Sequence, residues 1–251
     1  HPIPELRAAL ERMYNFDFPG AQKRLDSYIS THPAHPLGYS FRAAAHLFSE
    51  LDRLRILESE FLTDNDKIES DDKLEPNEQT RDAFVAAIQA SRSAAEKRSP
   101  TDTTALFAYC INEGLTSDYM AFVEKRRIGS LSFAKNSQNY ALELMRKDPK
   151  FVDAKLTSGI SEYLIGSLPF FLKWFIRFPQ VDGDKKKAVA NLQSVAADGL
   201  YLAPFARVLL AIVHLREKRP AESQAQLELL TRDYPENHLF RKELAKLRNK
   251  R

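Results

Sequence analysis

The chain has 251 residues, of which 43% are hydrophobic and 28% charged, and its formal net charge is +3. This content is enough to bury a large core, as one extended domain or as two lobes. No stretch of about 18 uninterrupted apolar residues is present, which excludes a helix that spans a bilayer. The single cysteine, Cys110, excludes an intrachain disulfide.

The expected secondary structure is helical. Eight glycines leave little room for tight hairpins, and no run of alternating β-branched residues is bounded by hairpin turns. Asp17 and Asp184 stand where an N-cap residue would accept a free backbone N–H. Lys218 and Arg219 would end one helix and Pro220 would open the next. We therefore expect an all-α fold.

A proline followed ten residues later by a small residue recurs along the chain. The pairs are Pro33/Ala43, Pro100/Cys110, Pro149/Gly159 and Pro235/Ala245, and Ala211 keeps the phase without a proline. A stack of antiparallel helix pairs needs a proline that starts a helix and a small side chain where helices cross closely. The spacing predicts an α-solenoid that is a single domain over 1–251, with units at 2–33, 36–99, 101–148, 150–199 and 202–234 and a capping helix at 236–250.

Matching small residues are expected in the second helix of each unit. They are Ala21, Ala87, Ser137, Ala188 and Ser223. The order small, small, large apolar, proline resembles the 34-residue tetratricopeptide repeat (TPR) over nearly the whole chain, although no unit keeps the usual early tryptophan and the middle units are stretched by long helices and insertions. The resemblance implies a TPR-like superhelix whose concave groove, built mainly by first helices, binds a peptide or protein partner without a cofactor.

The groove positions near the close crossings are the candidate binding residues. They are Tyr39, His46, Phe107, Asn112, Tyr163 and Arg207. No glycine-rich phosphate loop, nucleophile elbow, paired-histidine zinc helix or redox cysteine pair is present. The sequence therefore favours a non-enzymatic adaptor or scaffold with no catalytic residue.

Charge is unevenly distributed along the chain. Residues 58–78 contain nine acidic side chains, and the helix that ends at Arg251 is basic. The acidic segment approaches a calcium-binding loop, but Glu69 occupies the position where a glycine must turn. His32 and His35 are favoured as turn residues, so no metal is expected. Both charged segments are expected to be solvated, and a nucleic-acid partner is not expected because no aromatic side chains are interleaved with the basic residues.

An aromatic segment at 168–178 stands out between two prolines. Its candidate interface residues are Phe170, Phe171, Lys173, Trp174, Phe175 and Arg177. A helix with this composition must be covered by the protein itself, by a partner protein or by a membrane surface. A peripheral membrane-binding module is therefore the alternative function, and a third hypothesis makes this segment an oligomer interface.

A second resemblance is local to residues 159–197. This stretch has a leucine-proline pair, an apolar segment, and then Gly183-Asp184-Lys185, Leu192 and Ala196. It looks like the corresponding part of the inclusion-body-clearance family, which are TPR-like proteins of the mitochondrial outer membrane. The resemblance implies an adaptor that works near a membrane, and it transfers no catalytic residue.

The compartment is an expectation from resemblance only. The first residue, His1, is not methionine, which indicates a processed or trimmed product. Bacterial proteins with this repeat arrangement often carry export signals. A periplasmic or secreted location is therefore favoured, with a cytoplasmic one as the alternative.

Overall fold

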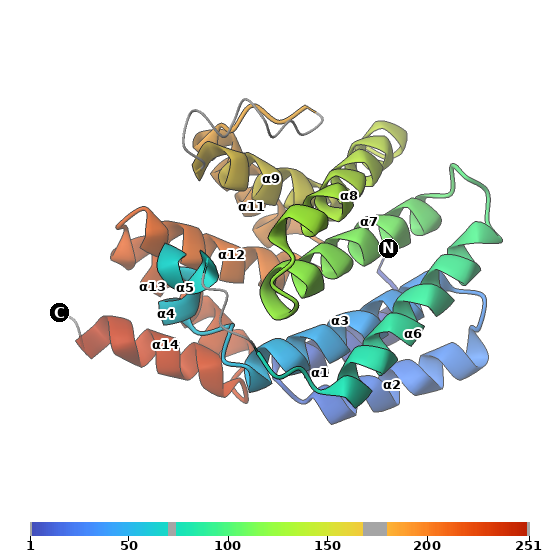
Figure 1. The fold of residues 1–251 in the computed structure, drawn as a ribbon, viewed down its shortest axis with the longest axis horizontal. Coiled ribbons are helices and arrows are strands. Elements are labelled where there is room, and N and C mark those ends of the chain that lie inside the picture. The colour runs from blue at the N-terminus through green and yellow to red at the C-terminus, as the bar shows by residue number, and fades with distance from the viewer. Residues whose placement is uncertain (1, 70–73, 168–179, 250–251) are drawn as a thin grey trace.

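All regular secondary structure in the described part of the chain is helical. The computed structural model describes residues 2–69, 74–167 and 180–249, and these ranges contain no strand (Figure 1). The all-α expectation is confirmed. None of the described helices is both long enough and apolar enough to cross a membrane.

The first half of the chain forms seven helices within the described residues. They are α1 (Pro4–Tyr14), α2 (Phe18–Thr31), α3 (Pro36–Arg53), α4 (Ser59–Leu62), α5 (Asn65–Glu69), α6 (Glu78–Glu96) and α7 (Thr103–Asp118), which continues into the π-helical turn η1 (Tyr119–Val123). α3 has 18 residues and α6 has 19, against 14 for α2.

The helices of the second half continue the same order. They are α8 (Arg127–Lys147), the 3₁₀ turn η2 (Val152–Ala154), α9 (Lys155–Ser167), α11 (Lys185–Asp198), α12 (Ala203–Arg216), α13 (Pro220–Asp233) and α14 (His238–Asn249). Apart from the short α4 and α5, each helix packs against the helix that follows it in the chain, from α1 on α2 to α13 on α14. α3 additionally contacts α1 and α7.

Most of the small residues that the spacing singles out are buried. The buried ones are Ala21, Ala43, Ala87, Cys110, Ser137, Gly159, Ala188, Ala211 and Ser223. A Cβ atom on Gly159 would lie 3.0 Å from Leu192 Cγ, so α9 and α11 approach too closely for a larger side chain. Ala245 is exposed, and the prediction was wrong there, because no later helix of the described chain packs on α14.

The prolines precede the helices instead of starting them. α3, α7 and α14 begin three residues after Pro33, Pro100 and Pro235 respectively. The residue just before the helix supplies the cap in two cases, because Asp102 accepts from the Ala105 N–H at 2.9 Å and Asn237 caps α14. Each of these prolines lies at the start of the turn that leads into the helix.

Residues far apart in the sequence join the two ends of the fold. Asn237 Nδ2 donates to the Tyr14 carbonyl at 2.7 Å, and the Ile3 N–H donates to the Tyr201 hydroxyl at 2.8 Å. Asn237 is fully buried. These bonds hold α1 against the elements around α12 and α14, so the succession of helices closes on itself.

The turn between α1 and α2 strengthens this closure. Phe16 has a φ of 62°, which is unusual for a bulky residue. Its ring lies 5.1 Å from that of Phe18, 5.4 Å from that of His238 and 6.4 Å from that of Phe240, centroid to centroid. The aromatic contacts with α14 hold the turn in this conformation.

The acidic segment lies against the basic C-terminal helix. The sequence predicts two separately solvated segments, whereas Lys242 Nζ is 3.0 Å from Glu58 Oε1 and Lys246 Nζ is 2.6 Å from Glu60 Oε2. Arg216 of α12 also donates to a backbone carbonyl of α4 at 2.9 Å. Opposite charges thus bring together residues that are far apart in the sequence. We call residues 58–69 the acidic strap.

Candidate functional site

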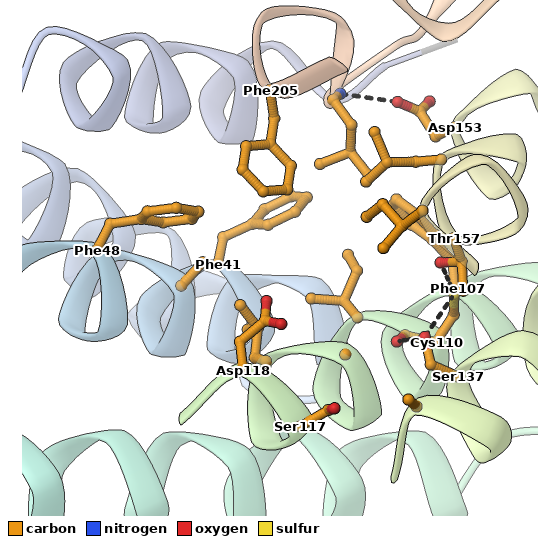
Figure 2. A pocket seen from close by; sticks show the side chains of 18 of the residues that line it. Phe41, Phe48, Phe107, Cys110, Ser117, Asp118, Ser137, Asp153, Thr157 and Phe205 are labelled. Carbon is orange, nitrogen blue, oxygen red and sulfur yellow. Dashed lines mark hydrogen bonds between the residues drawn. The ribbon is translucent and has the colours of Figure 1, made fainter. Parts of the chain in front are cut away.

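The closed arrangement of helices leaves an apolar cavity of about 150 Å³. Its lining comes from α1, α3, α7, α8, α9 and α12, together with η2 and the segment before α12. Figure 2 shows side chains from these elements converging on the cavity. Leu164 of α9 belongs to the lining and is 56% exposed, so the cavity reaches the surface beside α9.

Four phenylalanines give the cavity its apolar character. They are Phe41, Phe48, Phe107 and Phe205. The rings of Phe48 and Phe205 meet edge to face, with centroids 5.3 Å apart. This contact joins α3 to α12 across the cavity, because the chain closure brings the two helices together.

Asp153 fixes the segment that leads into α12. Its carboxylate accepts from the backbone N–H groups of Leu200 at 2.8 Å, Tyr201 at 3.1 Å and Leu202 at 2.7 Å. Burial raises the pKa of Asp153, and these three hydrogen bonds oppose the rise. Asp153 therefore has a structural role, because its hydrogen bonds place Leu202 and Phe205 at the cavity wall. Figure 2 shows Asp153 and Phe205 there.

Cys110 forms a small polar contact at another wall of the cavity. Its sulfur lies 3.3 Å from Thr157 Oγ1 and 3.6 Å from Ser137 Oγ (Figure 2). The thiol is buried, as the sequence predicts, and burial raises its pKa. The neutral thiol is a weak nucleophile, so this cysteine is a packing residue.

Asp118 is the carboxyl group of the lining for which the described residues supply no partner. It is the last residue of α7, directly before the π-helical turn η1. Figure 2 shows its carboxylate directed toward the cavity. Burial raises the pKa of Asp118 to about 7, and no hydrogen bond or ion pair within the described residues offsets this effect.

Of the six predicted groove residues, Phe107 lines the cavity. It is 1% exposed and its ring lies 4.7 Å from that of Phe151. Asn112 also lies on α7 but on a different face, where it accepts from Ser40 Oγ at 2.9 Å and donates to Ser91 Oγ at 2.9 Å. Asn112 is completely buried, so it connects α3, α6 and α7 and presents nothing to a partner.

The remaining four groove residues are spread over the molecule. The Tyr39 hydroxyl donates to the Pro33 carbonyl at 3.1 Å, and Tyr163 donates to Glu217 Oε1 at 3.1 Å. Arg207 donates to a backbone carbonyl of α11 at 2.9 Å. His46 is half-buried, and burial together with the nearby Arg42 lowers its pKa. None of these four lines the cavity.

The predicted aromatic interface lies outside the described residues. This applies to Phe170, Phe171, Lys173, Trp174, Phe175 and Arg177. The structure does describe the turn that follows them, where Glu162 Oε2 accepts from the N–H groups of Gly183 at 2.7 Å and Asp184 at 3.0 Å. Gly183 has a φ of +76°, a backbone conformation that favours glycine. This conformation explains the glycine in the Gly183-Asp184-Lys185 stretch.

Sequence reasoning missed most of the cavity. Phe41, Phe48 and Phe205 look like ordinary core residues of amphipathic helices, and nothing in their spacing marks an unfilled volume. Asp118 offered a weak signal, because it is a carboxylate between the large apolar residues Leu115 and Tyr119, in a helix whose only other carboxylate is Glu113. A charged residue at such a position needs a partner or a ligand.

No known protein family, curated protein or solved structure matches this chain. Among the described residues there is no group of three or more histidine, cysteine, aspartate or glutamate side chains that could hold a metal ion. Within the described residues, the fold and the site define an all-α protein with an apolar cavity that reaches the surface beside α9 and with one carboxyl group of the lining, Asp118, that has no partner.

Proposed function

We propose that this protein is a non-enzymatic, TPR-like adaptor that binds a peptide or protein partner on its inner helices, with an apolar group of the partner in the cavity. The observation that carries the proposal is the cavity itself. It is lined by apolar side chains of helices that are distant in the sequence but adjacent in space. A packed core rarely leaves such a volume without a purpose.

The set of helices that line the cavity supports the solenoid part of the proposal. α1, α3, α7, α9 and α12 are the helices expected to come first in their units, and all of them contribute to the lining. First helices form the inner surface of a TPR-like superhelix, which is the surface that such proteins use for binding. The burial of small residues at the predicted crossings agrees with close pairing of helices.

The size of the cavity suits an anchoring side chain. Apolar cavities of about 150 Å³ bind benzene-sized molecules. An aromatic or branched aliphatic side chain has this size, and burying one contributes roughly 1.5–3 kcal/mol. Peptide recognition through one or two such anchors is common, because a few buried groups carry most of the binding energy.

A variant that fills the cavity tests this proposal. Gly114 of α7 lines the cavity, and the nearest atom to an added Cβ is Ser137 Oγ at 3.5 Å, so larger side chains have room there. Gly114→Leu fills the cavity, whereas Gly114→Ala gives the helix a similar gain in propensity and leaves most of the cavity open. The two variants form a matched pair.

The experiment selects ligands from a displayed library of random peptides on the wild-type protein. We expect enriched peptides to share an apolar anchor, to bind Gly114→Ala like wild type and to bind Gly114→Leu at least tenfold more weakly. Undiminished binding to Gly114→Leu would place the binding surface elsewhere. Failure to enrich any peptide would contradict the peptide-adaptor proposal.

A further inference from the structure

Asp118 is a half-buried carboxyl group that lines the cavity, and no partner for it is found among the described residues. Most of the side chains that line the cavity are apolar, and Asp118 lies where the α-helix changes to a π-helical turn, a local irregularity that is often found at functional sites. A carboxylate without a partner destabilises the folded protein. Such an arrangement becomes favourable when a ligand supplies the missing partner.

The other titratable groups of the lining are already engaged. They are Tyr14, Cys110 and Asp153. The Tyr14 hydroxyl donates to the Tyr201 carbonyl at 3.2 Å, Asp153 accepts three backbone N–H groups, and Cys110 contacts two hydroxyls. No lysine, arginine or histidine is among the described residues that line the cavity. The cavity therefore presents one carboxyl group that can gain a partner.

We propose that the apolar group of the partner which enters this cavity carries a protonated amine, and that the amine pairs with the Asp118 carboxylate. This inference rests on the proposed function of the cavity. The phenylalanine rings would contact the apolar body, and the ammonium would donate a charge-assisted hydrogen bond to Asp118. Aromatic faces also attract an ammonium group, which adds to selection for a cation over a neutral ligand.

Two small probes distinguish binding of an apolar group in the cavity from pairing of an ammonium group with Asp118. Benzylamine and benzyl alcohol have nearly the same shape, and only benzylamine is charged at neutral pH. Calorimetric titrations at pH 8 compare both probes on the wild-type protein, Asp118→Asn and Gly114→Leu. We expect wild type to bind benzylamine at least tenfold more tightly than benzyl alcohol. Asp118→Asn should lose this preference and retain the binding of benzyl alcohol.

Proton release gives a second readout that needs only the wild-type protein. Pairing with an ammonium lowers the pKa of a carboxyl group. Because burial raises the pKa of Asp118 to about 7, benzylamine binding should release more protons at pH 6 than at pH 8. Titrations in buffers of different ionisation enthalpy measure the number of protons released. Benzyl alcohol should release none.

The outcomes distinguish this inference from the proposed function. If wild type binds both probes equally, releases no proton, and Gly114→Leu blocks both probes, the cavity is a binding site and the amine proposal is overturned. If neither probe binds wild type, the cavity takes no ligand and both proposals fall. If Asp118→Asn does not fold, the tenfold preference and the proton release of the wild type still decide the question.

Discussion

At the scale of single residues, Asp118 makes stability depend on pH in an unusual direction. Its pKa is about 7 in the folded protein and about 3.9 in an unfolded chain. The folded state therefore holds this proton more tightly, so the contribution of Asp118 to stability falls as the pH rises from about 4 to 7 and stays at its minimum above that range.

The variant Asp118→Asn should remove this pH dependence. We expect it to be more stable than wild type at pH 8 by on the order of 2 kcal/mol, because access of solvent to the cavity reduces the full effect of burial. At pH 4 the two proteins should be equally stable. Urea unfolding at pH 4, 6 and 8 measures the difference, with the exposed Asp198→Asn as control. An identical pH profile for wild type and Asp118→Asn would contradict this account.

Residue-level reasoning from the sequence was reliable where the signal is local. Asp17 and Asp184 act as helix caps, with Asp17 accepting from the Gly20 N–H at 2.9 Å and Asp184 from the Lys186 N–H at 2.8 Å. The roles of Asn112 and Phe107 could not be separated in this way. They lie five residues apart on one helix, and which of them faces a cavity depends on the packing of three other helices.

At the scale of elements, the acidic strap should be held mainly by charge. Hydrogen bonds from Arg55 and Lys242 lower the pKa of Glu58 to about 2, because together they outweigh the opposing effect of burial. This contribution to stability is present above the unfolded pKa of about 4.3 and is lost as the pH falls toward 2. Salt should weaken the same contacts, because the paired side chains are partly exposed.

Hydrogen exchange tests the attachment of the strap. Lys246→Met removes contacts with Glu60 and Glu243, at 2.6 and 2.8 Å, while keeping most of the side-chain length. We expect faster amide exchange within 59–69 and a loss of about 1 kcal/mol or less in global stability. Raising the salt concentration to about 1 M should have a similar local effect on wild type.

The exposed Lys23→Met on α2 is the matched control and should leave exchange in the strap unchanged. Protection of residues 59–69 that responds neither to Lys246→Met nor to salt would show that the strap is held by other forces. The sequence predicted an insertion at this place. Its attachment to α14 is a contact between residues about 180 positions apart, as in the bond from Ser59 to Glu243, and no periodic pattern reports such contacts.

At the scale of the whole molecule, closure between the chain's two ends keeps the cavity in shape. The Asn237 side chain makes two kinds of hydrogen bond. Its oxygen caps α14, and its amide group donates to the Tyr14 carbonyl. Asn237→Ser keeps a capping oxygen and loses the long-range bond. We expect it to cost about 1–3 kcal/mol, because a buried carbonyl loses its donor.

Asn237→Ala should cost about 1 kcal/mol more than Asn237→Ser, because it also removes the cap. Urea unfolding of both variants gives the two values. If both lie within about 0.5 kcal/mol of wild type, the bond does not hold the ends together. The succession of helices could be predicted from small-residue spacing, but closure could not, since it depends on the accumulated rotation of many helix pairs.

A small apolar molecule soaked into crystals of the protein shows whether the cavity receives an apolar group, as we propose. Crystals exposed to bromobenzene would locate the bromine by its anomalous scattering. We expect an anomalous peak inside the cavity, among Phe41, Phe107 and Phe205. Bromine found only elsewhere on the molecule, or no ordered bromine at saturating bromobenzene, would contradict the proposal.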